Sequence, residues 1–147
     1  MIFPNAESAL NALKTLYKDK QDLIDYRNEC DFLRAKIESI GSPLLSNAPH
    51  GSIPPGTDGD LIALYVDMQK TLHIRSNFHR EKLNAIINIL DNMHMPLYSR
   101  ILTCRYIKGM PWSSIANVTG YSKAHLYTLH RKALALYAAT AYDYDNK

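Results

Sequence analysis

Apolar side chains recur every three to four residues along most of this chain, which is the spacing of an amphipathic α-helix. The pattern holds from residue 6 to residue 40, a stretch with neither proline nor glycine. It returns from residue 60 to residue 92, where Asp58 or Asp60 is suited to cap the start of the helix. Both stretches are predicted to form long helices, the first of them about 50 Å in length.

The segment between them, residues 41–59, breaks this pattern. It contains four of the six glycines and four of the seven prolines, so we expect a flexible connector that is not helical. A connector of that length allows the second helix to fold back antiparallel on the first. Residues 1–94 are therefore predicted to form a helical hairpin that resembles a coiled coil. Because one helix pair seldom buries enough area to be stable alone, we expect a homodimer or higher homo-oligomer through residues 6–93.

Residues 112–137 contain two further amphipathic stretches that are separated by a tight turn. Gly120 can adopt the positive φ that ends the first stretch. The hydroxyl of Ser122 can cap the second by accepting a backbone N–H bond from Ala124 or His125. A helix, a short glycine-containing turn and a second helix form a helix-turn-helix. We expect its second helix to span residues 123–137.

A third short helix is predicted just before this motif. The helical pattern is interrupted at residues 93–96. Pro96 is suited to be the first residue of a helix that runs to Lys108 and ends at Gly109. The fold class is therefore all-α, with a three-helix helix-turn-helix domain at residues 95–140 after the hairpin. The last residues, 141–147, are expected to be a fraying tail.

The charged residues are unevenly distributed along the chain. The net charge is +3 at pH 7, but residues 92–142 contain six Lys or Arg and no Asp or Glu, which gives this block a charge of +6. Residues 1–91 carry ten basic and twelve acidic side chains, a charge of −2. The acid-free block coincides with the predicted helix-turn-helix and should attract polyanions. We therefore favour nucleic-acid binding over a solvated basic face without a partner.

Between residues 97 and 137, several separate positions together suggest a family. They are Leu102-Thr103-Cys104-Arg105-Tyr106, Gly109, Ile115-Ala116, Gly120, Ser122 and Lys132-Ala133-Leu134. In these positions the chain resembles region 4 of sigma-70-type transcription factors. The whole chain is similar to small phage and prophage proteins with two N-terminal helices, a Ser/Gly/Pro-rich loop and a sigma-region-4-like end. The ArpU and RinA group of such proteins is regarded as regulating phage late transcription.

The resemblance implies which residues would contact DNA. Base-reading positions fall on Lys123, Ala124, Tyr127 and Thr128, with Arg131 one turn further on, and backbone contacts fall on Arg105 or Lys108, Ser114 and Ser122. His125 and Lys132 join this set because their side chains can also donate hydrogen bonds or stack. Our predicted DNA-binding residues are thus Arg105, Lys108, Ser114, Ser122, Lys123, Ala124, His125, Tyr127, Thr128, Arg131 and Lys132.

The chain also departs from the sigma pattern. Ala124 replaces a usual acidic residue, Tyr127 and Thr128 replace long polar ones, and Pro111 occupies the place of a Ser or Thr helix cap. We therefore do not expect the promoter element read by sigma factors to be the target. Nothing resembles the core sigma domain that melts DNA, so a complete sigma factor is excluded.

The predicted function is that of a sequence-specific double-stranded DNA-binding transcriptional regulator of phage or prophage type, which reads the major groove with helix 123–137. One alternative is an adaptor that binds protein, with host RNA polymerase as the partner. Another is a packaging protein of the small-terminase type, which also joins a helix-turn-helix to an oligomerising helical part.

Other classes of function lack their sequence signals. There is no carboxylate pair, nucleophile elbow, metal-ligand spacing or phosphate-binding glycine loop, so we expect neither an enzyme nor a cofactor or metal. His125 and His130 share a helix face poorly. No apolar run approaches the roughly 20 residues of a membrane span, and we see no signal peptide, so we expect a cytoplasmic protein of a bacterial host cell. Cys30 and Cys104 are expected to be packed thiols.

Overall fold

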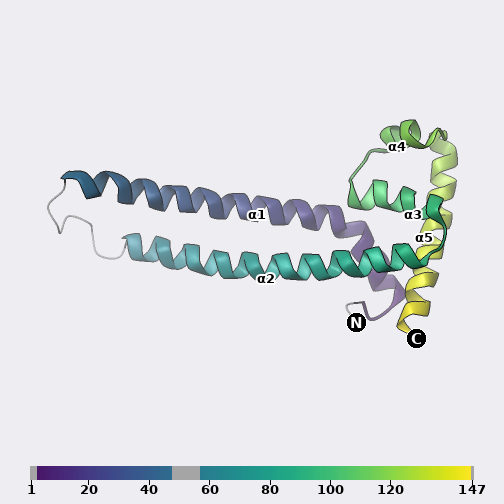
Figure 1. Ribbon diagram of the computed structural model, residues 1–147, viewed down its shortest axis with the longest axis horizontal. Helices are drawn as coiled ribbons and strands as arrows, with labels where there is room; N and C mark the ends of the chain where they lie inside the picture. The colour runs from purple at the N-terminus through teal and green to yellow at the C-terminus, as the bar shows by residue number, and fades with distance from the viewer. Residues whose placement is uncertain (1–2, 48–56, 147) are drawn as a thin grey trace. The chain divides into compact units, whose positions relative to one another are not determined.

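The computed structural model describes residues 3–47 and 57–146, and their side chains except at residues 41–47, 57–58 and 145. These ranges form helices joined by short turns, without a strand (Figure 1), so the predicted all-α class is confirmed. None of the helices in these ranges is both long and apolar enough to traverse a lipid bilayer. The helices are α1 (Ala6–Asn47), α2 (Thr57–Asn92), α3 (Pro96–Leu102), the π-helical segment η1 (Thr103–Ile107), α4 (Trp112–Thr119) and α5 (Lys123–Asp145).

The two long helices extend further than predicted into the glycine- and proline-rich segment. α1 continues through Gly41 to Asn47, and α2 already begins at Thr57. The prediction that residues 41–59 are not helical is therefore wrong at both ends. Once a helix has formed, each added residue costs little, and an interior glycine such as Gly41 costs only about 1 kcal/mol relative to alanine. Pro43 costs about 3 kcal/mol in a helix interior, and local propensity does not explain why α1 passes it. Asp58 and Asp60 consequently lie inside α2 rather than at its cap, and residues 48–56 lie outside the described residues.

Helix ends elsewhere follow from local side chains. At the start of α1, the Oδ1 atom of Asn5 accepts the backbone N–H of Ser8 at 2.8 Å, and the Ser8 hydroxyl accepts the N–H of Asn5 at 3.2 Å. This reciprocal cap satisfies two donors that a helix N-terminus leaves free. The predicted break after α2 is also confirmed, since His94 has a φ of 52° and α3 begins at Pro96.

The chain divides into two compact units, and the division differs from the predicted boundary between residues 94 and 95. One unit combines residues up to Lys20 with residues from His79 onward, and the other consists of Gln21–Phe78. The first turns of α1 and the last turns of α2 therefore belong with the short C-terminal helices. Sequence spacing does not reveal this division, because the apolar pattern of both long helices continues across it.

The unit that combines residues up to Lys20 with residues from His79 onward has a core to which α1, α2 and α5 all contribute. Leu13 of α1, Ile86 of α2 and Tyr137 of α5 are fully buried in one cluster. The Tyr137 hydroxyl donates to the backbone oxygen of Ala9 at 3.4 Å, and burial raises the pKa of this tyrosine. The predicted end of the last helix near Tyr137 and the fraying tail from residue 141 are wrong. Ala141, four residues after Tyr137, continues the same buried face and carries α5 to Asp145.

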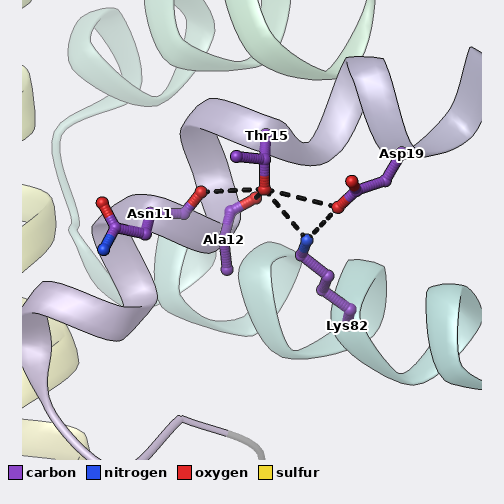
Figure 2. Close-up of polar contacts among 5 residues, drawn as sticks. All are labelled: Asn11, Ala12, Thr15, Asp19 and Lys82. Atoms are coloured by element: carbon purple, nitrogen blue, oxygen red, sulfur yellow. Dashed lines mark hydrogen bonds and ion pairs between the residues drawn. The ribbon is translucent and has the colours of Figure 1, made fainter.

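A buried cation lies within the same unit, between α1 and α2 (Figure 2). Lys82 is only 8% exposed. Its ammonium group donates to Thr15 Oγ1 at 3.1 Å and to the carboxylate of Asp19. The Thr15 hydroxyl itself donates to the backbone oxygen of Asn11 at 2.9 Å. The network satisfies a charge that would otherwise be costly to bury.

The unit from Gln21 to Phe78 contains the second half of α1 and the first half of α2, which lie side by side in Figure 1. The guanidinium of Arg75 lies over the ring of Tyr26, 4.6 Å from its centroid. Among the side chains described in this unit, only Cys30 and Leu33 are buried. Its apolar seam is thus much less covered than the core of the other unit.

Candidate nucleic-acid interface

The turn between α4 and α5 has the local geometry that the sequence predicts. Gly120 has a φ of 78°, and its N–H donates to the oxygen of Ala116 at 2.8 Å. The Ser122 hydroxyl accepts the N–H of His125 at 3.2 Å and so caps α5. Both predictions are therefore confirmed. Pro111 precedes α4 without a side-chain cap bond, so this helix begins without the Ser or Thr that the sigma pattern would provide.

The two faces of α5 differ sharply in burial and charge. Leu126, Leu129 and Ala133 are buried and form the inner face of its first half. With 3.6 residues per turn, the opposite face is centred on Ala124, Thr128 and Arg131. Ala124 and Arg131 are exposed and Thr128 is half-buried. The remaining predicted contacts on this helix flank that face and are all exposed: Lys123, His125, Tyr127 and Lys132.

The residues predicted to contact the DNA backbone are less uniform. Lys108 is exposed just after η1, and Ser114 is half-buried in α4. The Ser122 hydroxyl already serves as the cap of α5, although the residue itself is exposed. Arg105 points into the protein, since its Nη1 donates to the oxygen of Met110 at 3.1 Å. Of the two alternatives for one backbone contact, Lys108 is therefore the better placed.

Arg105 and Trp112 form part of an aromatic cluster that the sequence did not reveal. The Arg105 guanidinium lies over the Trp112 ring, 4.9 Å from its centroid. The same indole meets the ring of Tyr127 edge-on at 5.3 Å and the ring of His130 at 4.8 Å. Trp112 also packs against the cluster of buried residues around Ile115. It therefore links the core of this region to an exposed side chain on α5.

His130 is the half-buried end of this cluster. Its Nε2 atom is hydrogen bonded to the Tyr106 hydroxyl at 2.7 Å. Burial raises the pKa of Tyr106 and, together with the nearby charges of Arg105 and Lys14, lowers the pKa of His130. His125, by contrast, is exposed and packs against the ring of Tyr121. The two histidines of α5 therefore lie in different surroundings.

Acidification should weaken the fold partly through His130. Because the pKa of His130 is lowered from 6.5, the unfolded chain binds this proton at a higher pH than the folded chain does. The free energy of unfolding should then fall as the pH drops below about 6.5. We expect His130→Gln, whose amide can still bond to Tyr106, to lose less stability than the wild type between pH 7 and pH 5. Denaturant titrations followed by the fluorescence of Trp112, the only tryptophan, measure this; an equal loss in both proteins contradicts it.

Among the described residues, the positive charge of this region is not neutralised by acidic partners. In the part of the chain that the structure describes, the ion pairs are Arg34–Glu38 and Lys82–Asp19. Neither includes a Lys or Arg from the acid-free block of residues 92–142. Five of the six basic residues of that block are exposed. Four of these five are predicted DNA contacts: Lys108, Lys123, Arg131 and Lys132. They remain available to an anionic partner.

Other kinds of site find no such support. Within residues 3–47 and 57–146, no three His, Cys, Asp or Glu side chains come together as a metal site would need. Cys30 and Cys104 are buried free thiols, as the sequence predicts. Comparison of the chain with protein-family models, curated proteins and solved structures found no match. The properties of α5 and its surroundings are therefore the basis for a functional proposal.

Proposed function

We propose that this chain is a sequence-specific double-stranded DNA-binding regulator of phage or prophage type. In this proposal the long helices form a hairpin, and α3 to α5 form a sigma-region-4-like helix-turn-helix that sets α5 in the major groove. The observation that carries it is the group of exposed basic side chains on the first half of α5, which lies within the acid-free block of residues 92–142. The resemblance to sigma region 4 supports the same conclusion.

The physical basis of binding would be mainly electrostatic. Each Lys or Arg that neutralises a phosphate releases condensed counterions, which gives affinity that falls steeply with salt concentration. Lys108 and Lys132 are suited to such contacts, because both are exposed and neither lies at the centre of the outer face of α5. Sequence preference would come from side chains at the centre of that face.

Replacement of Lys123 and Arg131 by alanine should weaken duplex binding. Each substitution is expected to cost about 1–2 kcal/mol of binding free energy, because Arg131 is a charged donor on the outer face of α5 and Lys123 is one on its flank. Fluorescence anisotropy with mixed-sequence duplexes at low salt, followed by a salt titration, measures the effect. Lys36→Ala, which removes an exposed lysine from the other unit, is the matched control and should bind as the wild type does. Undiminished binding by the Lys123→Ala/Arg131→Ala double variant would remove α5 from the interface.

A second candidate function, binding to protein, is favoured by a different observation. Among its described side chains, the unit from Gln21 to Phe78 exposes six large apolar ones, and the most exposed are Phe32 (74%), Ile74 (68%) and Phe78 (61%). Such surface suits a homo-oligomer through residues 6–93 or an adaptor that contacts RNA polymerase. Sedimentation tests for the homo-oligomer, since a clean monomer at micromolar concentration argues against it. A ring-shaped oligomer would favour a packaging protein of the small-terminase type. Absence of duplex binding at low salt would favour the adaptor.

A further inference from the structure

We propose that the outer face of α5 recognises thymine, by contact between its apolar groups and the 5-methyl group in the major groove. The inference rests on the proposed DNA-binding function and adds the base that is read. It is carried by three neighbouring side chains, Ala124, Tyr127 and Thr128. Tyr127 and Thr128 lie about one helical turn after Ala124, and all three are on the side of α5 that faces away from its buried residues.

Three side chains of this face, those of Ala124, Tyr127 and Thr128, offer apolar groups next to the charged Arg131. Ala124 offers only a methyl group. The Thr128 hydroxyl donates to the backbone oxygen of Ala124 at 3.4 Å. With its proton directed at the helix, the hydroxyl can only accept a bond from a base, and the methyl group is available for an apolar contact. In the major groove, thymine is the base that presents a methyl group, and small apolar side chains and aromatic rings are suited to contact it.

The Tyr127 ring packs on one side against a neighbouring aromatic ring. It is 47% exposed, and the part that is covered meets the Trp112 indole edge-on at 5.3 Å. Trp112 is itself fixed, by the Arg105 guanidinium over its ring and by its packing against buried residues. A ring with such a packing partner loses less conformational freedom on binding than one without a partner. Trp112 thus acts as a positioning residue for the reading face.

The surroundings of this face favour duplex DNA as its occupant. Lys123 and Arg131 lie beside the three apolar groups, and both are exposed in the acid-free block. An apolar strip framed by positive charge fits the major groove, where bases lie between two rows of phosphates. The arrangement therefore complements the charge pattern of a duplex as well as the methyl group of thymine.

The test begins with duplexes that the full chain selects from a random library. Each thymine of a selected duplex is replaced in turn by deoxyuridine, which removes only the methyl group. At one or two positions we expect affinity to fall about fourfold, the value for one buried carbon group. Thr128→Val keeps the methyl group and should bind the selected duplex within about twofold of the wild type, whereas Thr128→Ser lacks it and should lose about fourfold.

The outcomes separate this inference from the proposed function. If the wild type enriches no duplex at low salt, DNA binding itself is wrong. If it binds a selected duplex but deoxyuridine has no effect at any position, thymine recognition is overturned and DNA binding stands. A loss with Thr128→Val and none with Thr128→Ser would also overturn it, because the hydroxyl, and not the methyl group, would then be the group that matters. A deoxyuridine effect that disappears in Thr128→Ser alone would establish the contact.

Discussion

Gly109→Ala is expected to lower the free energy of unfolding by about 2–4 kcal/mol, the sum of two separate costs. Gly109 has a φ of 68°, a conformation in which a side chain costs about 1–2 kcal/mol. In addition, a Cβ atom at this position would lie 2.6 Å from Cδ2 and Cζ of the Tyr17 ring and closer still to Cε2. The Tyr17 ring of α1 would have to move away from the loop before α4, and its contacts with that loop would be lost.

Gly120→Ala provides the control for the first of these costs. Gly120 has a similar φ, 78°, but a Cβ atom there would meet open space. It should therefore cost only about 1–2 kcal/mol in the same chemical denaturation experiment. In a Tyr17→Ala background the Gly109→Ala cost should fall to the value of Gly120→Ala, because the clash is gone. If Gly109→Ala and Gly120→Ala cost the same in the wild-type background, Tyr17 does not pack on Gly109.

The features that the sequence could predict are those set by neighbouring residues. Pro96 begins a helix because its fixed φ suits the first turn, and Gly120 ends one because it tolerates positive φ. Ser122 caps α5 through a bond that spans only three residues. The end of α5 was missed because Ala141 is held in the helix by packing with distant residues. Local propensity fixes where helices can begin and end, and tertiary contacts decide how far they extend.

The candidate site was predictable to the same extent. The outer face of α5 follows from helical periodicity, so the exposure of Lys123, Ala124 and Arg131 could be expected. The inward position of Arg105 could not, since the Met110 oxygen and the Trp112 ring reach it only through the loop after η1. The bond between Tyr106 and His130 likewise joins residues 24 positions apart. A basic residue in sequence is thus a candidate contact only until its internal partners are known.

Asp19→Ala should destabilise the protein more than Lys82→Met, although both break the same ion pair. The Lys82 side chain is 11% exposed and that of Asp19 is 40% exposed. Without Asp19, a nearly buried ammonium group keeps only Thr15 as a described partner, and we expect a loss of about 2–3 kcal/mol. This is below the cost for a fully buried pair, because water already reaches the carboxylate side.

Lys82→Met leaves the opposite remnant, a carboxylate that water can solvate and that Thr15 Oγ1 still approaches at 3.3 Å. Methionine fills a similar volume with apolar groups, so its cost should be about 1 kcal/mol or less. The Asp19→Ala/Lys82→Met double variant should then be more stable than Asp19→Ala alone, since the uncompensated charge has been removed. Urea denaturation of the four proteins gives the coupling energy directly. Equal losses for the two single variants would mean that an unpaired ammonium group costs no more here than an unpaired carboxylate. That result would contradict the asymmetry that we expect from the exposures of the two side chains.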